Sequence, residues 1–439
     1  MNRKEIPENT IDIIAEHINK RSNMPARLPI ITIDSNSCSP HYFEILPFDQ
    51  IDNSESKYFS VDGSYNGQEF HNGIYVGLYT AGYVCYQKGK QLRLNDLDDP
   101  VILGKSYFPE NILITNDQHR EAVFDELLSL DPVQTLLGFF QAEDVDSIWG
   151  LGKETRRLVC SSVSKLLSFC QEVLEWALIL EILELPITIK GDFILRDGTL
   201  RSNNIKQKYL INIGKKASEK GVHLLAVTKN SPLKLELSST FKKIDRYLET
   251  EKKPTYPFTI QNKKWQKLCC WFEVPDDALL DAYPDAEQRK MVASGEIERP
   301  QKYSMYAASS LTSGRGFGVF FAARLDYVEK LQNYDWVIID LNIFDIMPSI
   351  SEQMEENEIR KLQRNMQLFS NIFKELTCLT QEHYILGYPY PLVEAHNFVT
   401  LKKSFKDEVV KRVKASLYHS QMMDHVDIEN MFLDIHDRF

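Results

Sequence analysis

The order of strand-like and helical segments is the feature that most limits how this chain can fold. Three early segments, 57–67, 73–87 and 100–108, are rich in Val, Ile, Tyr and Phe and are interrupted by Gly and Asn. This composition is typical of antiparallel strands or hairpins. We therefore expect the ordered part of the chain to begin with an antiparallel sheet.

Helical and strand-like segments then alternate along the chain. The second helical segment stops just before Pro186, which a helix interior would exclude. Antiparallel strands followed by β-α-β units predict an α/β protein with a mixed sheet flanked by helices, a layout that resembles ribonuclease H-like nucleases. The segments are helical at 117–130, 153–185 and roughly 203–220, and strand-like at 192–198 and 222–231.

The remaining segments set the expected domain boundaries. Residues 1–50 combine a short helical pattern with an irregular stretch, so we expect an N-terminal extension followed by one domain over 51–439. Within that domain we expect a long loop at 275–316. Further strands are expected at 318–325 and 335–344, and amphipathic helices at 352–378 and 404–421.

Composition is that of a globular protein that works inside the cell. Among 439 residues, 43% are hydrophobic and 26% are charged. No apolar run approaches the ~20 residues that cross a bilayer, and the N-terminus lacks the apolar core of a secretory signal. The seven cysteines form no CxxC pair. We therefore expect reduced thiols, a cytoplasmic location and no membrane contact.

Charge is distributed unevenly along the chain. The net charge is −11, and residues 91–150 carry twelve acidic and three basic side chains. Residues 201–250 instead carry eleven basic and four acidic side chains. A basic segment on an acidic chain fits an enzyme that admits a polyanion at one place. A solvated, lysine-rich face is an equally good interpretation.

Two Asp-Gly pairs follow strand-like runs and are candidate sites of chemistry. Asp62 closes FSVD before Gly63, and Asp197 closes FILRD before Gly198. A turn at each glycine would leave both carboxylates at the carboxyl edge of one sheet. Carboxylates are the ligands that Mg²⁺ and Mn²⁺ prefer, and two such ions can cleave a phosphodiester. Asp-Gly is also a favoured turn dipeptide without any function.

A third carboxylate is expected from the helical segment that precedes Asp197. Glu175 shares a helix face with apolar residues three, four and seven positions later, so its side chain can point inward and require a partner. Glu181 is nearly as well placed. A solvated helix face is the more common explanation of any single glutamate in such a segment.

A last motif lies near the C-terminus, in GYPYPLVEAHNF at 387–398. The prolines keep its first part extended. His396 follows where a helix could begin, and could bind a metal or a scissile phosphate.

Taken together, these motifs resemble the NurA family of DNA-end-processing nucleases. The resemblance spans roughly residues 57–400 and rests on VDGSYNG, QEVLEWALILE leading into FILRDGTL, LLAVTKNS and YPYPLVEAH. It implies a metal site, a tyrosine lining that site and a lysine contacting DNA. The residues concerned are Asp62, Glu175, Asp197 and His396 for the metal, Tyr388 for the lining and Lys229 for DNA.

The resemblance also implies an activity and partners. It implies a ribonuclease H-like nuclease domain over 51–439, cleavage of DNA that depends on Mn²⁺ or Mg²⁺, and a homodimer docked on a HerA-type hexameric ATPase. The biological role would be DNA repair or antiviral defence. The spacing from Glu175 to Asp197 is longer than expected for the family, so Glu181 stays an alternative ligand. Residues 230–330 match nothing in it.

Two other functions are compatible with the sequence. The chain could be a non-catalytic adaptor that keeps the fold in order to bind an ATPase. It could also be a metal-dependent phosphohydrolase acting on small phosphoesters. An adaptor would need neither Asp-Gly aspartate, and the lysine-rich 201–250 segment favours a long polyanion over a small one.

Overall fold

A computed structural model describes the central part of the chain almost continuously. The described residues are 46–48, 50–69, 75–96, 99–102, 104–107, 113–114, 117–202, 204–228, 231–249, 269–274, 278, 317–328, 333–346, 366–380 and 387–400, with short pieces at 12–13, 15–16, 408, 411–412, 414–416, 418–419 and 429.

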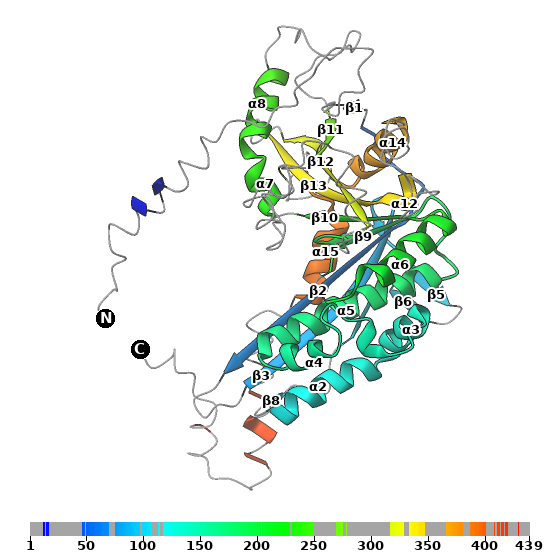
Figure 1. The fold of residues 1–439 in the computed structure, drawn as a ribbon. Helices are drawn as coiled ribbons and strands as arrows, with labels where there is room; N and C mark the ends of the chain where they lie inside the picture. Colours follow the sequence, from blue (N-terminus) through cyan, green and yellow to red (C-terminus); the bar gives the residue numbers. More distant parts are fainter. Residues whose placement is uncertain are drawn as a thin grey trace.

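A mixed sheet runs through the molecule (Figure 1). The strand order is β1-β11-β12-β13-β10-β9-β2-β3-β4, and β7 and β8 also pair with β3, which gives 11 strands among the described residues. A separate pair is formed by β5 and β6. The strands are β1 (Leu46–Phe48), β2 (Tyr58–Glu69), β3 (Tyr75–Gln87), β4 (Lys90–Gln91), β5 (Arg93–Asp96), β6 (Asp99–Ile102), β7 (Gly104–Tyr107), β8 (Leu113–Ile114), β9 (Phe193–Asp197), β10 (His223–Thr228), β11 (Cys269–Glu273), β12 (Gly318–Val328) and β13 (Asn333–Asn342).

The centre of the sheet is parallel and its flanks are antiparallel. β9 pairs parallel with β2 on one side and with β10 on the other. β2 pairs antiparallel with β3, and β10 pairs antiparallel with β13. The early antiparallel hairpin and the later β-α-β units are therefore present, which confirms the mixed α/β, ribonuclease H-like layout expected from the order of segments.

Helices cover both faces of the sheet (Figure 1). α5 packs on β2 and β3 and α6 packs on β10 from one face, while α15 packs on β2, β3 and β9 and α14 packs on β1 and β12 from the other. The helices are α2 (Asp117–Ser129), α3 (Asp131–Phe140), a 3₁₀ turn η1 (Val145–Ser147), α4 (Glu154–Val159), α5 (Val163–Glu184), α6 (Gln207–Lys220), α7 (Pro232–Glu236), α8 (Ser238–Glu249), α12 (Ile343–Ile346), α14 (Met366–Thr377) and α15 (Tyr390–Val399).

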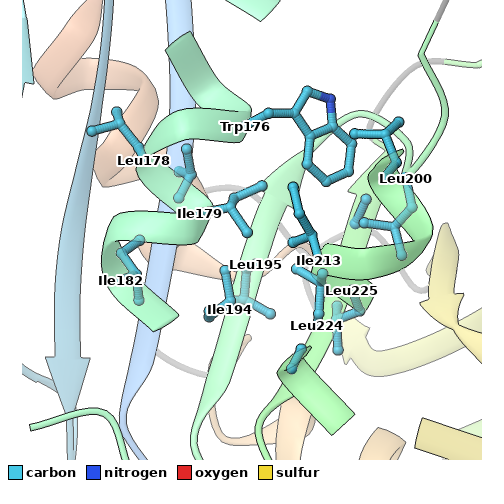
Figure 2. Close-up of a cluster of buried hydrophobic side chains, with 14 of the residues drawn as sticks. Trp176, Leu178, Ile179, Ile182, Ile194, Leu195, Leu200, Ile213, Leu224 and Leu225 are labelled. Carbon is cyan, nitrogen blue, oxygen red and sulfur yellow. The ribbon is translucent and has the colours of Figure 1, made fainter. Parts of the chain in front are cut away.

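The main core lies between the sheet and the layer of α5 and α6. α5 is buried on nearly every side because α2, α3 and α4 cover its outer surface while β2 and β3 lie beneath it. This explains why its sequence is apolar almost all round rather than along one stripe. Figure 2 shows the aliphatic side chains and the indole that fill this space, with labels on Trp176, Leu178, Ile179, Ile182, Ile194, Leu195, Leu200, Ile213, Leu224 and Leu225.

The helical pattern at 153–185 forms two helices rather than one. α4 ends at Val159, and the chain becomes extended at Ser162, with φ −146° and ψ 135°, before α5 begins. The hydroxyl of Ser161 donates to the carbonyl of Leu158 at 2.7 Å, a local bond that competes with continuation of the helix. The end of this pattern just before Pro186 is confirmed, because α5 stops at Glu184.

Other elements agree with the sequence to within a few residues. α6 begins at Gln207 rather than near residue 203, and β12 and β13 match the strands expected in the C-terminal half. β1 lies within the stretch assigned to the N-terminal extension, yet it pairs with β11 in the main sheet. The expected loop at 275–316 and helix at 404–421 lie largely outside the described residues.

None of the helices among the described residues is both long enough and apolar enough to cross a membrane.

Candidate metal centre

Two aspartates lie next to each other where the parallel pairing of β2 and β9 stops. The last register pair of these strands is Val61 with Arg196. Asp62 and Asp197 are therefore the next residues on the two strands. Because equivalent positions of neighbouring strands face the same side of a sheet, both carboxylates point to the face covered by α15.

His396 approaches the same carboxylates from α15. Its Nδ1 atom lies 2.8 Å from Asp62 Oδ2, and its side chain keeps 58% of its surface exposed. The other oxygen of Asp62 accepts the backbone N–H of Gly63 at 2.8 Å. Asp62 is thus buried and fixed from two directions, while the imidazole of His396 stands at the boundary with solvent.

Asp62, Asp197 and His396 form a group that could hold a metal ion, called the metal centre below. Each offers a ligand atom, and these atoms lie within 4.8 Å of one another, the only such group of His, Cys, Asp and Glu in the part of the chain that the structure describes. Carboxylate oxygens suit Mg²⁺ and Mn²⁺, and an imidazole nitrogen suits a transition metal. The donor set therefore fits Mn²⁺ at least as well as Mg²⁺.

The environment of Asp197 disfavours its charged form when no cation is present. Burial, followed by the negative charge of Asp62, raises the pKa of Asp197 to about 6, while Tyr388, His396 and Arg196 act in the opposite direction. A buried and a half-buried carboxylate that repel each other are a setting in which a bound cation is favourable.

Tyr388 lies beside Asp197, as the sequence motif implied. Its ring is buried, and its hydroxyl donates to the backbone carbonyl of Val227 at 3.3 Å. Val227 is the register partner of Asp197 on β10. Burial and the charge of Asp197 raise the pKa of Tyr388 well above its usual value, so the hydroxyl keeps its proton and can act as a donor.

The two Asp-Gly pairs differ in conformation. Gly198 has φ +113° and begins the turn after β9, as expected. Gly63 does not open a turn, because β2 continues through it and pairs Gly63 with Ala81 of β3. That part of the prediction is wrong. The role of Gly63 is steric, since a Cβ atom there would lie 2.5 Å from Gln171 Cγ and 2.6 Å from Glu175 Oε1.

Glu175 lies close to the metal centre but is not one of its three members. Its Oε2 atom accepts from Arg196 Nε at 3.0 Å and from Arg196 Nη2 at 2.7 Å, and its Oε1 accepts from Gln171 Nε2 at 2.8 Å. Burial raises the pKa of Glu175 to about 7 against the lowering effect of Arg196, and the charge of Asp62 raises it further.

The alternative glutamate and the expected lysine have other placements. Glu181 accepts a hydrogen bond at 3.2 Å from the hydroxyl of Tyr107, the last residue of β7. Lys229 directly follows β10 and lies outside the described residues. The structure therefore brings Asp62, Asp197, His396 and Tyr388 together, places Glu175 beside them and places Glu181 elsewhere.

Sequence reasoning missed Arg196, which is buried and bonded to Glu175. Besides that pair, its Nη1 donates to the carbonyl of Thr199, and its guanidinium stacks over Trp176 at 5.0 Å from the ring centroid. The arginine inside the apolar run FILRD could have predicted this ion pair, because a buried cation requires an anionic partner. A glutamate facing inward on the preceding helix was that partner.

Several lysines of the basic 201–250 segment have intramolecular partners. Lys220 Nζ donates to the carbonyls of Leu183 and Leu185 at 2.5 Å and 3.1 Å, which caps the C-terminus of α5. Lys216 Nζ lies 2.6 Å from Glu184 Oε1. These two lysines connect α6 to α5 on the face of the sheet that lies away from His396.

Comparisons with known proteins return a likeness in structure only. No family model and no curated protein matches the sequence. The NurA nuclease from Sulfolobus solfataricus is similar with a TM-score of 0.37 and 14% identity, over 95% of this chain and 96% of that chain. A NurA structure bound to dAMP and manganese is similar with a TM-score of 0.33 and 13% identity, over 98% of this chain and 99% of that chain. At these values the matches by themselves assign no activity.

Proposed function

We propose that this chain is a metal-dependent nuclease that hydrolyses the phosphodiester bonds of DNA. The observation that carries the proposal is the metal centre, in which ligand atoms of Asp62, Asp197 and His396 lie within 4.8 Å of one another. The three residues come from two strands and one helix that are far apart in the sequence. Packing of the core alone gives no reason to gather a buried carboxylate, a half-buried carboxylate and an imidazole at this place in the sheet.

The residues present fit a divalent cation, Mn²⁺ or Mg²⁺. The raised pKa of Asp197, about 6, reflects burial and the nearby charge of Asp62, both of which a cation would offset. A cation held here supplies Lewis-acid activation of the phosphate and of an attacking water. Asp62 Oδ2 lies 2.8 Å from His396 Nδ1, and this contact holds the imidazole beside the two carboxylates.

The remaining roles belong to residues around the metal centre. Tyr388, whose hydroxyl donates to the Val227 carbonyl, would line the site beside the substrate phosphate. Lys229, the residue after β10, would neutralise charge on the DNA backbone near the cleaved bond. Both roles follow the motif resemblance. Tyr388 also contacts Val227, the register partner of Asp197, while Lys229 is placed only by its position in the sequence after β10.

The test is degradation of linear DNA with Mn²⁺ by the purified chain. Asp62→Asn and Asp197→Asn should each lower the rate at least about 1000-fold, because each removes several kcal/mol of transition-state stabilisation. Glu181→Gln is the matched control, since Glu181 lies on α5 away from the metal centre and should retain most of the activity. Thermal unfolding of all variants should stay close to wild type. Wild-type rates in either aspartate variant would refute the proposal.

The same assay separates the alternative functions. A non-catalytic adaptor would leave DNA intact with every cation. A phosphohydrolase would release phosphate from nucleotides or small phosphoesters faster than it degrades DNA.

The cellular setting is part of the proposal and rests on the motif resemblance. The chain would act as a homodimer in the cytoplasm, docked on a HerA-type hexameric ATPase that feeds it DNA. Its role would be the processing of DNA ends, in repair or in antiviral defence.

A further inference from the structure

Glu175 and His396 approach β2 from opposite faces of the sheet. A Cβ atom on Gly63 would point toward α5 and lie 2.6 Å from Glu175 Oε1. The preceding residue, Asp62, instead directs its carboxylate to His396 on α15. Successive side chains of a strand point to opposite faces. Glu175 is therefore separated from the metal centre by the backbone of β2.

Arg196 and Gln171 occupy both carboxylate oxygens of Glu175. Two guanidinium N–H groups converge on Oε2 at 2.7 Å and 3.0 Å, and the Gln171 amide donates to Oε1 at 2.8 Å. The side chains of Glu175 and Arg196 are 3% and 8% exposed. Moving Glu175 to a metal ion would leave a buried guanidinium without its charge partner, which is strongly unfavourable.

Arg196 also holds the turn that follows Asp197. Its Nη1 donates to the carbonyl of Thr199, two residues beyond the aspartate. The next residue in this turn, Leu200, donates its backbone N–H to Asp340 Oδ2 at 2.8 Å. Arg196 thus connects the helix that carries Glu175 to the backbone that carries a metal ligand.

We propose that Arg196 is a positioning residue that keeps Glu175 out of the ligand set and fixes the Asp197 turn, so that the metal centre binds one divalent cation per chain through Asp62, Asp197 and His396. Glu175 then acts through Arg196 rather than on the cation. This inference rests on the proposed function only in taking Mn²⁺ as the cation, and it replaces a two-ion site with a one-ion site.

Binding of Mn²⁺ without DNA tests the ligand set directly. Isothermal calorimetry and the loss of free Mn²⁺ signal in electron paramagnetic resonance both count ions per chain. We expect one ion for wild type and no measurable binding for Asp62→Asn. The double variant Glu175→Gln with Arg196→Met removes both members of the buried pair, and it should still bind one ion. Circular dichroism checks that this variant is folded.

The conservative variant Arg196→Lys tests positioning. Lysine keeps the charge but cannot make the converging bonds to Glu175 together with the bond to Thr199. We expect one Mn²⁺ per chain with affinity lowered roughly 10- to 100-fold, the usual effect of losing a residue that orients metal ligands. The kcat for DNA should fall while the KM for DNA stays near wild type.

Specific results would overturn the inference. Binding of two Mn²⁺ ions, or of none, by the wild type would contradict it. Loss of Mn²⁺ binding in the double variant, as in Asp62→Asn, would also contradict it. Unchanged Mn²⁺ affinity in Arg196→Lys would remove the positioning role. If wild type binds one ion but leaves DNA intact, the proposed nuclease function fails while the assignment of the ligand set stands.

Discussion

Gly63 is the residue at which a missing side chain lets α5 approach β2. Gly63→Ala would place a Cβ atom 2.5 Å from Gln171 Cγ and 2.6 Å from Glu175 Oε1, so these side chains must move. We expect a loss of about 1–3 kcal/mol in the free energy of unfolding, as for other overpacked cores. Denaturant unfolding measures it. Gly138→Ala, where a Cβ atom meets nothing within 4 Å, is the control and should be neutral or stabilising.

Asp340 should make stability depend on pH. Burial raises the pKa of Asp340 to about 6 from a usual 3.8, against the lowering effects of Arg201 and the Leu200 amide. The folded chain therefore holds this proton more tightly than the unfolded chain does. The contribution of protonated Asp340 to the free energy of unfolding is fully present below about pH 4 and is lost as the pH rises to about 6.

The variant Asp340→Asn isolates this effect, because asparagine can still accept the Leu200 N–H. The difference in unfolding free energy between variant and wild type should shift in favour of the variant by up to about 3 kcal/mol from pH 4 to pH 7. Urea unfolding at each pH, with a chelator present, gives this difference. A difference that is constant across this range would contradict the prediction.

Among the elements, α6 shows that the lysines of a basic segment can hold two helices together. Lys220 caps the end of α5, and Lys216 pairs with Glu184. Lys216→Ala combined with Lys220→Ala should lower the free energy of unfolding by about 1–2 kcal/mol, mainly through the lost capping bonds. The salt dependence of DNA binding should stay the same, because these lysines release no counterions from phosphate. Fluorescence anisotropy over a salt series measures it, and a shallower slope would indicate that α6 contacts DNA.

At the scale of the whole molecule, the net charge of −11 should make DNA binding by the isolated chain weak. Binding through a few lysines weakens steeply with salt. An ATPase that holds a DNA end at the site would replace intrinsic affinity with a high effective concentration. We therefore expect degradation of long duplex DNA at near-physiological salt to rise sharply when the HerA-type ATPase and ATP are added.

The assembly experiment has its own control and its own counter-result. Asp197→Asn with the same ATPase and ATP should leave DNA intact, which excludes a contaminating nuclease. Light scattering should give the mass of a dimer. Equal rates with and without the ATPase, or a strictly monomeric active chain, would contradict this picture.

Features that depend on local pattern could be predicted from the amino-acid sequence. Content of Val, Ile, Tyr and Phe predicted β2 and β3, strand-like runs at 192–198 and 222–231 predicted β9 and β10, and Pro186 predicted the end of α5. The turn at Gly198 was also predictable, because Asp-Gly favours positive φ locally. The register of two parallel strands then brings Asp197 beside Asp62, a pairing that the matching Asp-Gly motifs anticipated.

Contacts between groups that are distant in the chain could not be predicted in this way, because they depend on how the helices pack against the sheet. Asp62 and His396 are 334 residues apart, and their contact depends on how α15 packs against the sheet. The partner of Glu175 depends on which face of β9 presents Arg196 to α5, so an inward-facing glutamate predicted a partner but not its identity. Gly63 looked like a turn residue, yet the pairing of β2 with β3 continues through it. The turn preference of Asp-Gly contributes less free energy than the continuous β2–β3 hydrogen bonds and the contact of α5 with β2. Those interactions exist only once the chain has folded.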